Sequence, residues 1–390
     1  MIDVYSSEFL QDPYPFYSEF RSHHPVFNIG NDWVIARYKD VTRVLTDWRT
    51  FSARKRANSL KNLFESQTDG GLPGLNVLDP PEHSRLRKPI SAYFSGPRIA
   101  GLETEIETIA SDLIEKLLRK TNGDVVTDIG GPLAAITTSR ILGLNPEHFL
   151  KYKTWTEASL YYKDLGLNKE DRSRIRKEFR QFFVEFWEQV KNGGAKGILN
   201  ELNGFTEEES ILFGMFLLIA GSESTSNFLG NAVNVLLKHP DVLQTLIHNP
   251  ALIKNFIEST LRYDGPVKTL VRVSTKDVEL SGVTIPEGCR VVALIGSANR
   301  DPEVFEDPDR FRLEGENIKH LSFGGGAHYC PGDDLARMQT EIVLRKLIPL
   351  LAELPPVDLR SLEYRSSVRA RGLKHLPLPF HCIRGGNQRA

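Results

Sequence analysis

The residue whose setting most suggests chemistry is a cysteine, Cys330, which follows a run of glycines and precedes a predicted helix. Glycines carry no side chain, so the backbone from Phe323 to Gly332 is free to approach a flat ligand closely. A thiolate near a helix N-terminus and unpaired N–H groups has its charged form favoured, and the thiolate is the form that binds a metal ion. The alternative is a buried structural cysteine, which is our interpretation of Cys289 and Cys382.

An acid and an alcohol are adjacent in a second candidate site, where Glu223 precedes Ser224. The small residues Ala220 and Gly221 just before them would let a helix approach a cofactor. A hydroxyl that bonds back to the carbonyl four residues earlier can open a local groove in a helix. Such an acid–alcohol pair could hold water and relay protons, which is a positioned acid–base role. The alternative is that Glu223 is a solvated helix residue.

A histidine and an arginine form a third candidate site, because His83 and Arg87 are four residues apart. Side chains at this spacing on a helix are neighbours and can reach one anion together. A solvated polar face is the alternative for this pair.

Four common signatures are absent from the sequence: GxxxxGK[ST], GxGxxG, HExxH and GxSxG. Their absence excludes the Walker-type phosphate loop, the dinucleotide fingerprint, and the usual zinc-protease and serine-hydrolase sites.

The apolar residues have helical spacing over most of the chain. The segments that show this period are 12–22, 101–119, 179–190 and 335–351. Residues 206–209 have the form of a capping box, which predicts that a long apolar helix begins there and runs past Asn231. Residues 33–38 and 268–295 have strand patterning instead, with a turn at Ser281 and Gly282. The acid–alcohol pair would therefore lie within the long helix.

Composition and charge are those of a globular protein that can build a large core. The 390 residues are 40% hydrophobic and 25% charged, and 49 Lys and Arg against 50 Asp and Glu give a net charge of −1. This balance removes the usual electrostatic reason to expect nucleic acid as the main partner.

Neither a secretory signal nor a membrane span is expected. The N-terminus has no basic region followed by an apolar one. The longest apolar stretch, Ile211–Gly221, is well short of the roughly 20 residues that a bilayer requires. The cysteines are odd in number and form no CxxC pattern, which fits a reducing cytosol. We therefore expect a cytoplasmic protein.

The loop around Cys330 matches a longer pattern, FGxGxHxCxGxxLAR. The matched positions are Phe323, Gly324, Gly326, His328, Cys330, Gly332, Leu335, Ala336 and Arg337. This pattern resembles the haem-ligand loop of the cytochrome P450 family of haem-thiolate monooxygenases. The resemblance implies that the Cys330 thiolate is the metal ligand of haem b, onto whose iron it pushes electron density. It also implies that Phe323 shields the sulfur, that Gly324 and Gly332 adjoin the cofactor, and that His328 lies near a haem propionate.

Other segments extend the resemblance over nearly the whole chain. They are residues 12–15, 298–302, 307–311 and 371–377. Residues 79–87 look like the family's segment in which His83 and Arg87 clamp propionates, and Arg272 matches a strand arginine that also binds one. The implied fold is mainly α with small β-sheets. It is a single domain over residues 1–390, with the haem buried between the long central helix and the Cys330 loop.

Residues 220–224 are similar to the family's AGx(D/E)T motif on the oxygen-activation helix. The similarity brings Ala220 and Gly221 to the cofactor and gives Glu223 the acid role and Ser224 the alcohol role. Serine replaces the family's threonine, which keeps the hydroxyl but loses a methyl group and some rotamer stiffness.

The implied activity is a monooxygenase that inserts one oxygen atom from O2 into a small organic substrate, by hydroxylation or epoxidation, in specialised metabolism. Electrons would come from a ferredoxin and an NAD(P)H-dependent reductase, because the sequence holds no flavin domain. We expect a monomer with neither nucleic acid nor membrane as a partner. Two alternatives stay open: redox-neutral, coupling or peroxide-driven chemistry on the same fold, or a non-catalytic module that recruits another protein.

The same resemblance predicts where the substrate and the redox partner meet the protein. Residues 55–78 and 152–187 would form the lid of the substrate pocket, with Trp155, Tyr161 and Tyr162 in it. Basic residues could meet an acidic partner on the cysteine side, and they are Arg85, Lys88, Arg337, Arg345 and Lys346.

One position departs from the family pattern. The family has ExxR before the arginine that is Arg262 here, and its glutamate pairs with that arginine and with a second one, here Arg310. Ser259 stands where the glutamate belongs. Two arginines packed together without a carboxylate would be costly. We predict that Glu258 either turns in to replace the missing group in part, or forms an exposed pair with Arg262.

Overall fold

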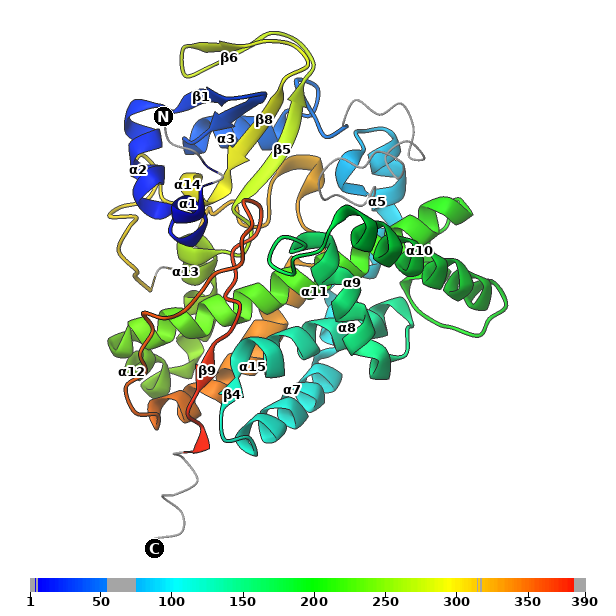
Figure 1. Ribbon diagram of the computed structural model, residues 1–390, viewed down its shortest axis with the longest axis vertical. Coiled ribbons are helices and arrows are strands. Elements are labelled where there is room, and N and C mark those ends of the chain that lie inside the picture. Colours follow the sequence, from blue (N-terminus) through cyan, green and yellow to red (C-terminus); the bar gives the residue numbers. More distant parts are fainter. Residues whose placement is uncertain (1–3, 5, 55–74, 314, 316–317, 382–390) are drawn as a thin grey trace, which may run out of the picture.

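The computed structural model describes residues 4, 6–54, 75–313, 315 and 318–381, and most of them are helical (Figure 1). Most of the lid segment expected at 55–78, together with Cys382, lies outside the described residues. The helices are α1 (Ser7–Gln11), α2 (Tyr14–His23), α3 (Tyr38–Thr46), α5 (Glu82–Tyr93), α6 (Gly96–Ala100), α7 (Glu103–Leu118), α8 (Gly131–Leu142), α9 (Phe149–Leu160), α10 (Lys169–Lys191), α11 (Glu207–Lys238), α12 (Pro240–His248), α13 (Ile253–Asp264), α14 (Ile295–Ala298) and α15 (Asp333–Ala352).

The strands are short and form small sheets beside the helices. They are β1 (Val26–Ile29), β2 (Asp32–Ile35), β3 (Phe51–Ser52), β4 (Gly123–Asp124), β5 (Thr269–Ser274), β6 (Val278–Leu280), β7 (Val283–Ile285), β8 (Arg290–Leu294) and β9 (Pro377–Leu378). The largest sheet has five strands in the order β1-β2-β8-β5-β3, and β4-β9 and β6-β7 form two-stranded sheets. Strands β2 and β8 are parallel, and the other neighbours in the five-stranded sheet are antiparallel.

The predicted turn at Ser281 and Gly282 joins β6 to β7, with φ of 46° and 79° at the two residues. The strand pair predicted around residues 33–38 is present as β1 and β2, but it ends earlier than predicted. Strand β2 ends at Ile35, and α3 begins at Tyr38. The Asp301 carboxylate accepts a hydrogen bond from the Tyr38 N–H at 2.8 Å, so a group far along the chain satisfies a free donor in the first turn of this helix.

Helix α11 runs through the middle of the molecule and contacts α8, α9, α10, α13 and α15 (Figure 1). It begins at the predicted capping box: Glu209 N–H donates to Thr206 Oγ1 at 3.2 Å, and Thr206 N–H donates to the Glu209 carboxylate at 2.8 Å. By length and composition it could cross a membrane, but 72% of its most apolar window is buried inside the protein. It is thus the core helix of this fold.

Helix α15 follows the Cys330 loop and packs against α7, α11, α12 and α13. Strand β5 pairs with β8 in the large sheet. Different neighbouring elements therefore position α11, the Cys330 loop and β5.

Candidate active site

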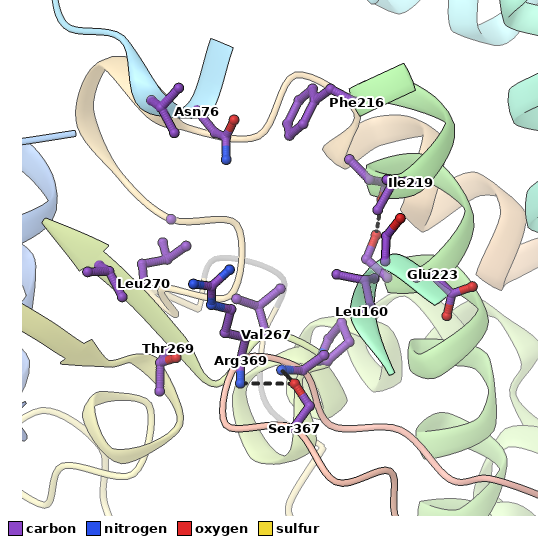
Figure 2. A pocket seen from close by; sticks show the side chains of 18 of the residues that line it. Asn76, Leu160, Phe216, Ile219, Glu223, Val267, Thr269, Leu270, Ser367 and Arg369 are labelled. Carbon is purple, nitrogen blue, oxygen red and sulfur yellow. Dashed lines mark hydrogen bonds between the residues drawn. The ribbon is translucent and has the colours of Figure 1, made fainter. Parts of the chain in front are cut away.

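A cavity of about 1690 Å³ lies between α11, the Cys330 loop and β5. Figure 2 shows Phe216 and Ile219 of α11 facing Val267 and Leu270 across it. Every residue predicted to bind the cofactor lines this cavity, and so do the predicted acid and alcohol. They are His83, Arg87, Ala220, Gly221, Glu223, Ser224, Arg272, Phe323, Gly324, His328, Cys330 and Gly332. The fold thus brings together residues that are up to 249 positions apart in sequence, the separation of His83 and Gly332.

The Cys330 loop is a tight turn held at both ends. Cys330 N–H donates to the Phe323 carbonyl at 2.9 Å, and Gly332 caps the N-terminus of α15. Gly324 and Gly326 have φ of 75° and 63°, a region that favours glycine. A Cβ on Gly326 would lie 2.9 Å from the Thr46 Cα, so this glycine lets the loop pack against α3. Part of the glycine requirement therefore comes from packing and not from a ligand.

Burial dominates the electrostatics of Cys330. It raises the pKa of the thiol to about 11, although the Gly332 N–H and the nearby Arg87 and Arg337 lower it. The expectation that the helix N-terminus alone favours the thiolate is therefore wrong for the protein by itself, because loss of hydration outweighs the nearby donors. A coordinated metal cation reverses this balance, since a ligating thiol is deprotonated.

A buried histidine and a half-buried one lie next to each other near the cysteine. The rings of His83, on α5, and His328 have their centroids 4.3 Å apart. Among the described residues, neither ring nitrogen of His83 has a hydrogen-bond partner, and the Nε2 of His328 has none either. Burial, with Arg87 and Arg272 nearby, lowers the pKa of His83 to about 4 and that of His328 to about 3. Both imidazoles are therefore neutral at pH 7 and have one N–H each. His328 uses its N–H on the Leu78 backbone carbonyl, whereas the N–H of His83 is left to donate.

Two arginines and the two histidines fit a group with two carboxylates. They are Arg87, Arg272, His83 and His328. Arg272 is buried, with its Nη1 donating to the Val271 carbonyl at 2.9 Å, and Arg87 is half-buried on α5. Buried polar atoms without partners are rare in proteins, so His83, with no partner at either ring nitrogen among the described residues, indicates a missing acceptor. A thiol, two arginines, two neutral histidines and an apolar cavity match the iron, the propionates and the ring of haem b.

Glu223 is buried, so its interpretation as a solvated helix residue is wrong. Its side chain accepts a hydrogen bond from Thr156 Oγ1 on α9 at 3.0 Å, and Figure 2 shows its carboxylate directed away from the large cavity. Burial raises the pKa of Glu223 to about 7, an effect that Arg365 opposes and Glu157 supports. Thr156, Glu157 and Arg365 line a second, small cavity of about 10 Å³ that Glu223 shares. A cavity of this size holds about one water molecule.

Ser224 and its neighbours follow the predicted geometry with one exception. The Ser224 hydroxyl donates to the Ala220 carbonyl at 2.7 Å, which is the predicted bond back along the helix. Ala220 is exposed to the cavity. A Cβ on Gly221 would lie 2.6 Å from Thr138 Oγ1, so this glycine chiefly allows α11 to pack closely against α8.

Ser259 replaces the glutamate of the family's ExxR pattern, but the two arginines of that pattern, Arg262 and Arg310, do not pack together. Arg262 is buried, donates to the carbonyls of Asn299 and Pro308 at 3.2 and 3.0 Å, and lies over the Phe305 ring. Arg310 is exposed. The expected pair of stacked arginines is therefore absent from this part of the described chain, and Arg310 points to solvent instead.

Glu258 turns in, as one of the two predictions stated, but its partners are not the predicted ones, and the alternative of an exposed pair with Arg262 is wrong. Its carboxylate accepts hydrogen bonds from Arg337 at 2.6 and 3.2 Å and contacts the His320 Nε2 at 3.1 Å. Arg337 in turn lies over the Phe323 ring, 4.5 Å from its centroid. Glu258 thus connects α13 to residues on both sides of Cys330.

The sequence-based lid prediction is correct for some residues only. Trp155 stacks on Phe179 within an aromatic core, and Tyr161 is fully buried with its hydroxyl bonded to Asn227. Tyr162 lines the cavity. Residues 75–78 of the predicted segment include cavity-lining positions, and 55–74 lie outside the described residues.

Three residues of the site carried no signal in the sequence. Thr156 reaches Glu223 across 67 positions, and His320 reaches Glu258 across 62. Arg369, from a loop near the C-terminus, directs its guanidinium into the cavity in Figure 2. Each depends on packing between distant segments, which has no local periodicity to detect.

Comparisons with known proteins agree with this geometry. A family model described as Cytochrome P450 matches residues 149–350. Cytochrome P450 107B1 of Saccharopolyspora erythraea is 33% identical, with 96% of each chain covered. Vitamin D(3) 25-hydroxylase of Pseudonocardia autotrophica is 31% identical, again with 96% of each chain covered.

A solved structure is similar over the same length. CYP109E1 of Bacillus megaterium in complex with testosterone has a TM-score of 0.87 and is 27% identical, with 96% of this chain and 99% of that one covered. The match therefore includes the fold, the cavity-forming elements and the Cys330 loop. The chain belongs to the cytochrome P450 family.

Proposed function

We propose that this haem-thiolate monooxygenase inserts one oxygen atom from O2 into a bulky, largely apolar organic molecule, by hydroxylation or epoxidation. The observation that carries the proposal is the large apolar cavity that joins Cys330 to the Glu223–Ser224 pair. The names of the relatives include a vitamin D(3) hydroxylase and a testosterone complex, and both molecules are bulky and apolar. A single domain over residues 1–390 is part of the proposal, supported by relatives that align along 96% of the chain.

Haem b, when bound, supplies the redox chemistry, and a thiolate ligand favours cleavage of the O–O bond. In the proposed arrangement Cys330 ligates the iron. His83, Arg87, Arg272 and His328 hold the propionates, because their donors converge on the cavity. Phe323 covers the sulfur side and is itself held by the Arg337 guanidinium.

Glu223 is the proposed proton donor and acceptor of the site. With a pKa of about 7 it can take up and give off a proton near neutral pH. Thr156 orients its carboxylate through the hydrogen bond at 3.0 Å. The small cavity beside it leads toward Glu157, which pairs with Arg365 at 2.8 Å and Lys153 at 3.4 Å. These charged side chains connect Glu223 to the outside of α9.

Ser224 is the proposed water-positioning group. Its hydroxyl hydrogen is committed to the Ala220 carbonyl, so its oxygen lone pairs are the part that can accept a hydrogen bond. A water held there would lie on the cavity side of α11, because Ala220 offers little side chain to exclude it.

Electrons require a partner protein, for which a ferredoxin with an NAD(P)H-dependent reductase is the proposed source, with the protein a cytoplasmic monomer. Of the basic residues considered for docking, Arg85 pairs with Glu209, Arg337 with Glu258 and Arg345 with Glu341. Lys88 is exposed and Lys346 is half-buried. We place the partner contact on Lys88 and its surroundings, on the cysteine side of α5.

The test is isotope incorporation during turnover. The haem-loaded protein is supplied with NADPH, a surrogate ferredoxin and its reductase, and a panel of steroids and other bulky apolar molecules under ¹⁸O2. A monooxygenase adds one ¹⁸O atom to the product and forms none without O2 or without electrons. Product formation that needs neither, or a product without ¹⁸O, would instead establish redox-neutral or peroxide-driven chemistry.

A further inference from the structure

The charge lining the cavity is strongly one-sided. Its described lining holds ten Lys and Arg side chains and a single acidic one, Glu223. Burial raises the pKa of that acid to about 7, which reduces its negative charge at neutral pH. Across the whole chain the two signs balance, with 49 basic and 50 acidic residues. The positive excess is therefore a local property of this cavity.

Three of the ten cations have roles that do not involve a substrate. Arg87 and Arg272 belong to the proposed propionate site, and Arg290 pairs with Asp32 at 3.1 Å. The others are Arg369 and six residues between 163 and 180, on α10 and just before it.

Arg369 lies on a loop that is fixed by its backbone. Its N–H donates to Ser367 Oγ at 3.2 Å, and its carbonyl accepts from the Lys268 N–H at 2.8 Å. In Figure 2 the guanidinium extends into the cavity, between the Leu270 side and the α11 wall. A guanidinium is a planar fork of donors that matches a carboxylate or a phosphate with two parallel hydrogen bonds. A substrate in this cavity therefore meets that fork beside apolar walls.

Helix α10 carries a row of arginines that line the cavity. Arg172, Arg176 and Arg180 are four residues apart and half-buried, so they share one face. Like charges at this spacing repel, and burial and Arg172 lower the pKa of Arg176. Arg180 pairs with Glu208 at 2.6 Å, and Arg172 lies over the Tyr162 ring, 3.7 Å from its centroid. The row gives this side of the cavity a positive potential that attracts anions.

We propose that the substrate of this cavity is an organic anion, with an apolar body against Phe216, Ile219 and Leu270 and a carboxylate or phosphate at Arg369. The arginine row of α10 draws it in. The inference rests on the proposed function for the identity of the cavity and adds the chemical class of its ligand.

The experiment compares ligands of one chain length that differ only in head group. Dodecanoate, dodecyl phosphate and dodecan-1-ol are titrated into the haem-loaded full chain, and Kd is measured by the haem spectral shift and by calorimetry. At least one anion should bind about tenfold or more tightly than the alcohol. A tighter carboxylate identifies an acid as the ligand class, and a tighter phosphate identifies a phosphate ester.

Substitutions of cavity arginines test where the anionic head group of the ligand binds. R369Q should bring the anion Kd to within about twofold of the alcohol Kd while leaving the alcohol Kd unchanged. R290Q is the matched control, since Arg290 lines the same cavity but is paired with Asp32, and it should keep the preference. R172Q/R176Q should weaken the salt dependence of anion binding.

Equal affinity for all three ligands, or a preference that survives in R369Q, would overturn the proposal. Either result is distinguishable from failure of the monooxygenase function, because ¹⁸O incorporation into a neutral substrate does not depend on an anion site.

Discussion

Among single residues, Cys330 has the most direct consequence. Cys330→Ala should abolish the red-shifted Soret band of thiolate-ligated haem in the reduced, carbon-monoxide-treated protein. Cys330 is two residues from His328, whereas Cys289, the other described cysteine that lines the cavity, lies beside β8. The control is Cys289→Ala, which replaces a half-buried cysteine of the β region and should keep the band. A retained thiolate band in Cys330→Ala would contradict the proposed ligand.

Ser224→Ala should separate electron consumption from product formation. The variant keeps haem binding but removes the hydroxyl that bonds to Ala220, so reducing equivalents should go to hydrogen peroxide. The measurement is the ratio of product to NADPH consumed, with peroxide quantified alongside. Ser224→Thr restores the family's residue and should give wild-type coupling or better. Unchanged coupling in Ser224→Ala would mean that the substrate or another group positions the water.

Glu223 makes stability depend on pH in a predictable direction. Burial raises the carboxyl pKa from 4.5 to about 7, so between these values the folded protein binds more protons than the unfolded chain. The free energy of unfolding should therefore fall as pH rises through that window, by up to about 3 kcal/mol, and Glu223→Gln should lack this component. Denaturant titrations at about pH 5 and pH 8 measure the difference. Parallel pH dependence in both proteins would show that Glu223 titrates normally.

At the scale of elements, Glu258 joins α13 to the cysteine loop and to α15. It contacts His320 before the loop and Arg337 after it, and its side chain is 11% exposed. Through these partners Glu258 stabilises the Cys330 loop, which is the role that the missing ExxR glutamate would have had with other partners. The loss of that glutamate is therefore compatible with a well-held cysteine loop.

Glu258→Ala should lower the free energy of unfolding by about 2–4 kcal/mol, because it leaves buried donors without an acceptor. The loss of about 5 kcal/mol that a fully buried ion pair can show is not expected, since the Arg337 side chain is 29% exposed. The variant should also lose part of its thiolate-type carbon monoxide complex as the loop loosens. Glu341→Ala is the control: it removes the half-buried partner of the exposed Arg345 on the same α15 and should cost no more than about 1 kcal/mol. Equal effects of the two substitutions would refute the connection.

At the scale of the whole molecule, a buried charge cluster around Asp264 holds the chain ends to the core. The carboxylate pairs with Lys268 at 3.1 Å and Arg371 at 3.2 Å and accepts a hydrogen bond from the Tyr14 hydroxyl. Although burial alone would raise it, these cations hold the pKa of Asp264 far below its usual range. The cluster thus joins α2, α13 and the segment that precedes β9.

Asp264→Asn should therefore cost about 3–5 kcal/mol of unfolding free energy, since it leaves buried cations without their counter-charge. Wild-type stability should also fall as pH drops below the ordinary carboxyl value of 3.8, because the folded state resists the protonation that the unfolded chain accepts. Thermal unfolding of both proteins over an acid series measures both effects. An acid sensitivity that persists unchanged in Asp264→Asn would assign it to other groups.

Properties that depend on neighbours in sequence were predictable from the sequence alone. The Cys330 loop has its matched positions within 15 consecutive residues, 323–337, so its pattern is complete in one segment. The capping box at Thr206 and the hydroxyl bond of Ser224 are also contacts within one turn, and both are present. Helical and strand periods gave the mainly α fold with a β region near 268–295 for the same reason.

Tertiary structure decided everything that depends on burial or on distant partners. Helical geometry placed Glu258 near Arg262, but its partners His320 and Arg337 lie 62 and 79 positions away, and packing of α13 against α15 selects them. The pKa values of Cys330 and Glu223 are both raised because the surrounding elements exclude water. This exclusion cannot be predicted from a local sequence pattern. Arg369 reaches the cavity because its loop hydrogen-bonds to the start of β5, a long-range contact. Motifs therefore predicted the proposed cofactor ligands, whereas the charge and proton chemistry around them arises only when the chain folds.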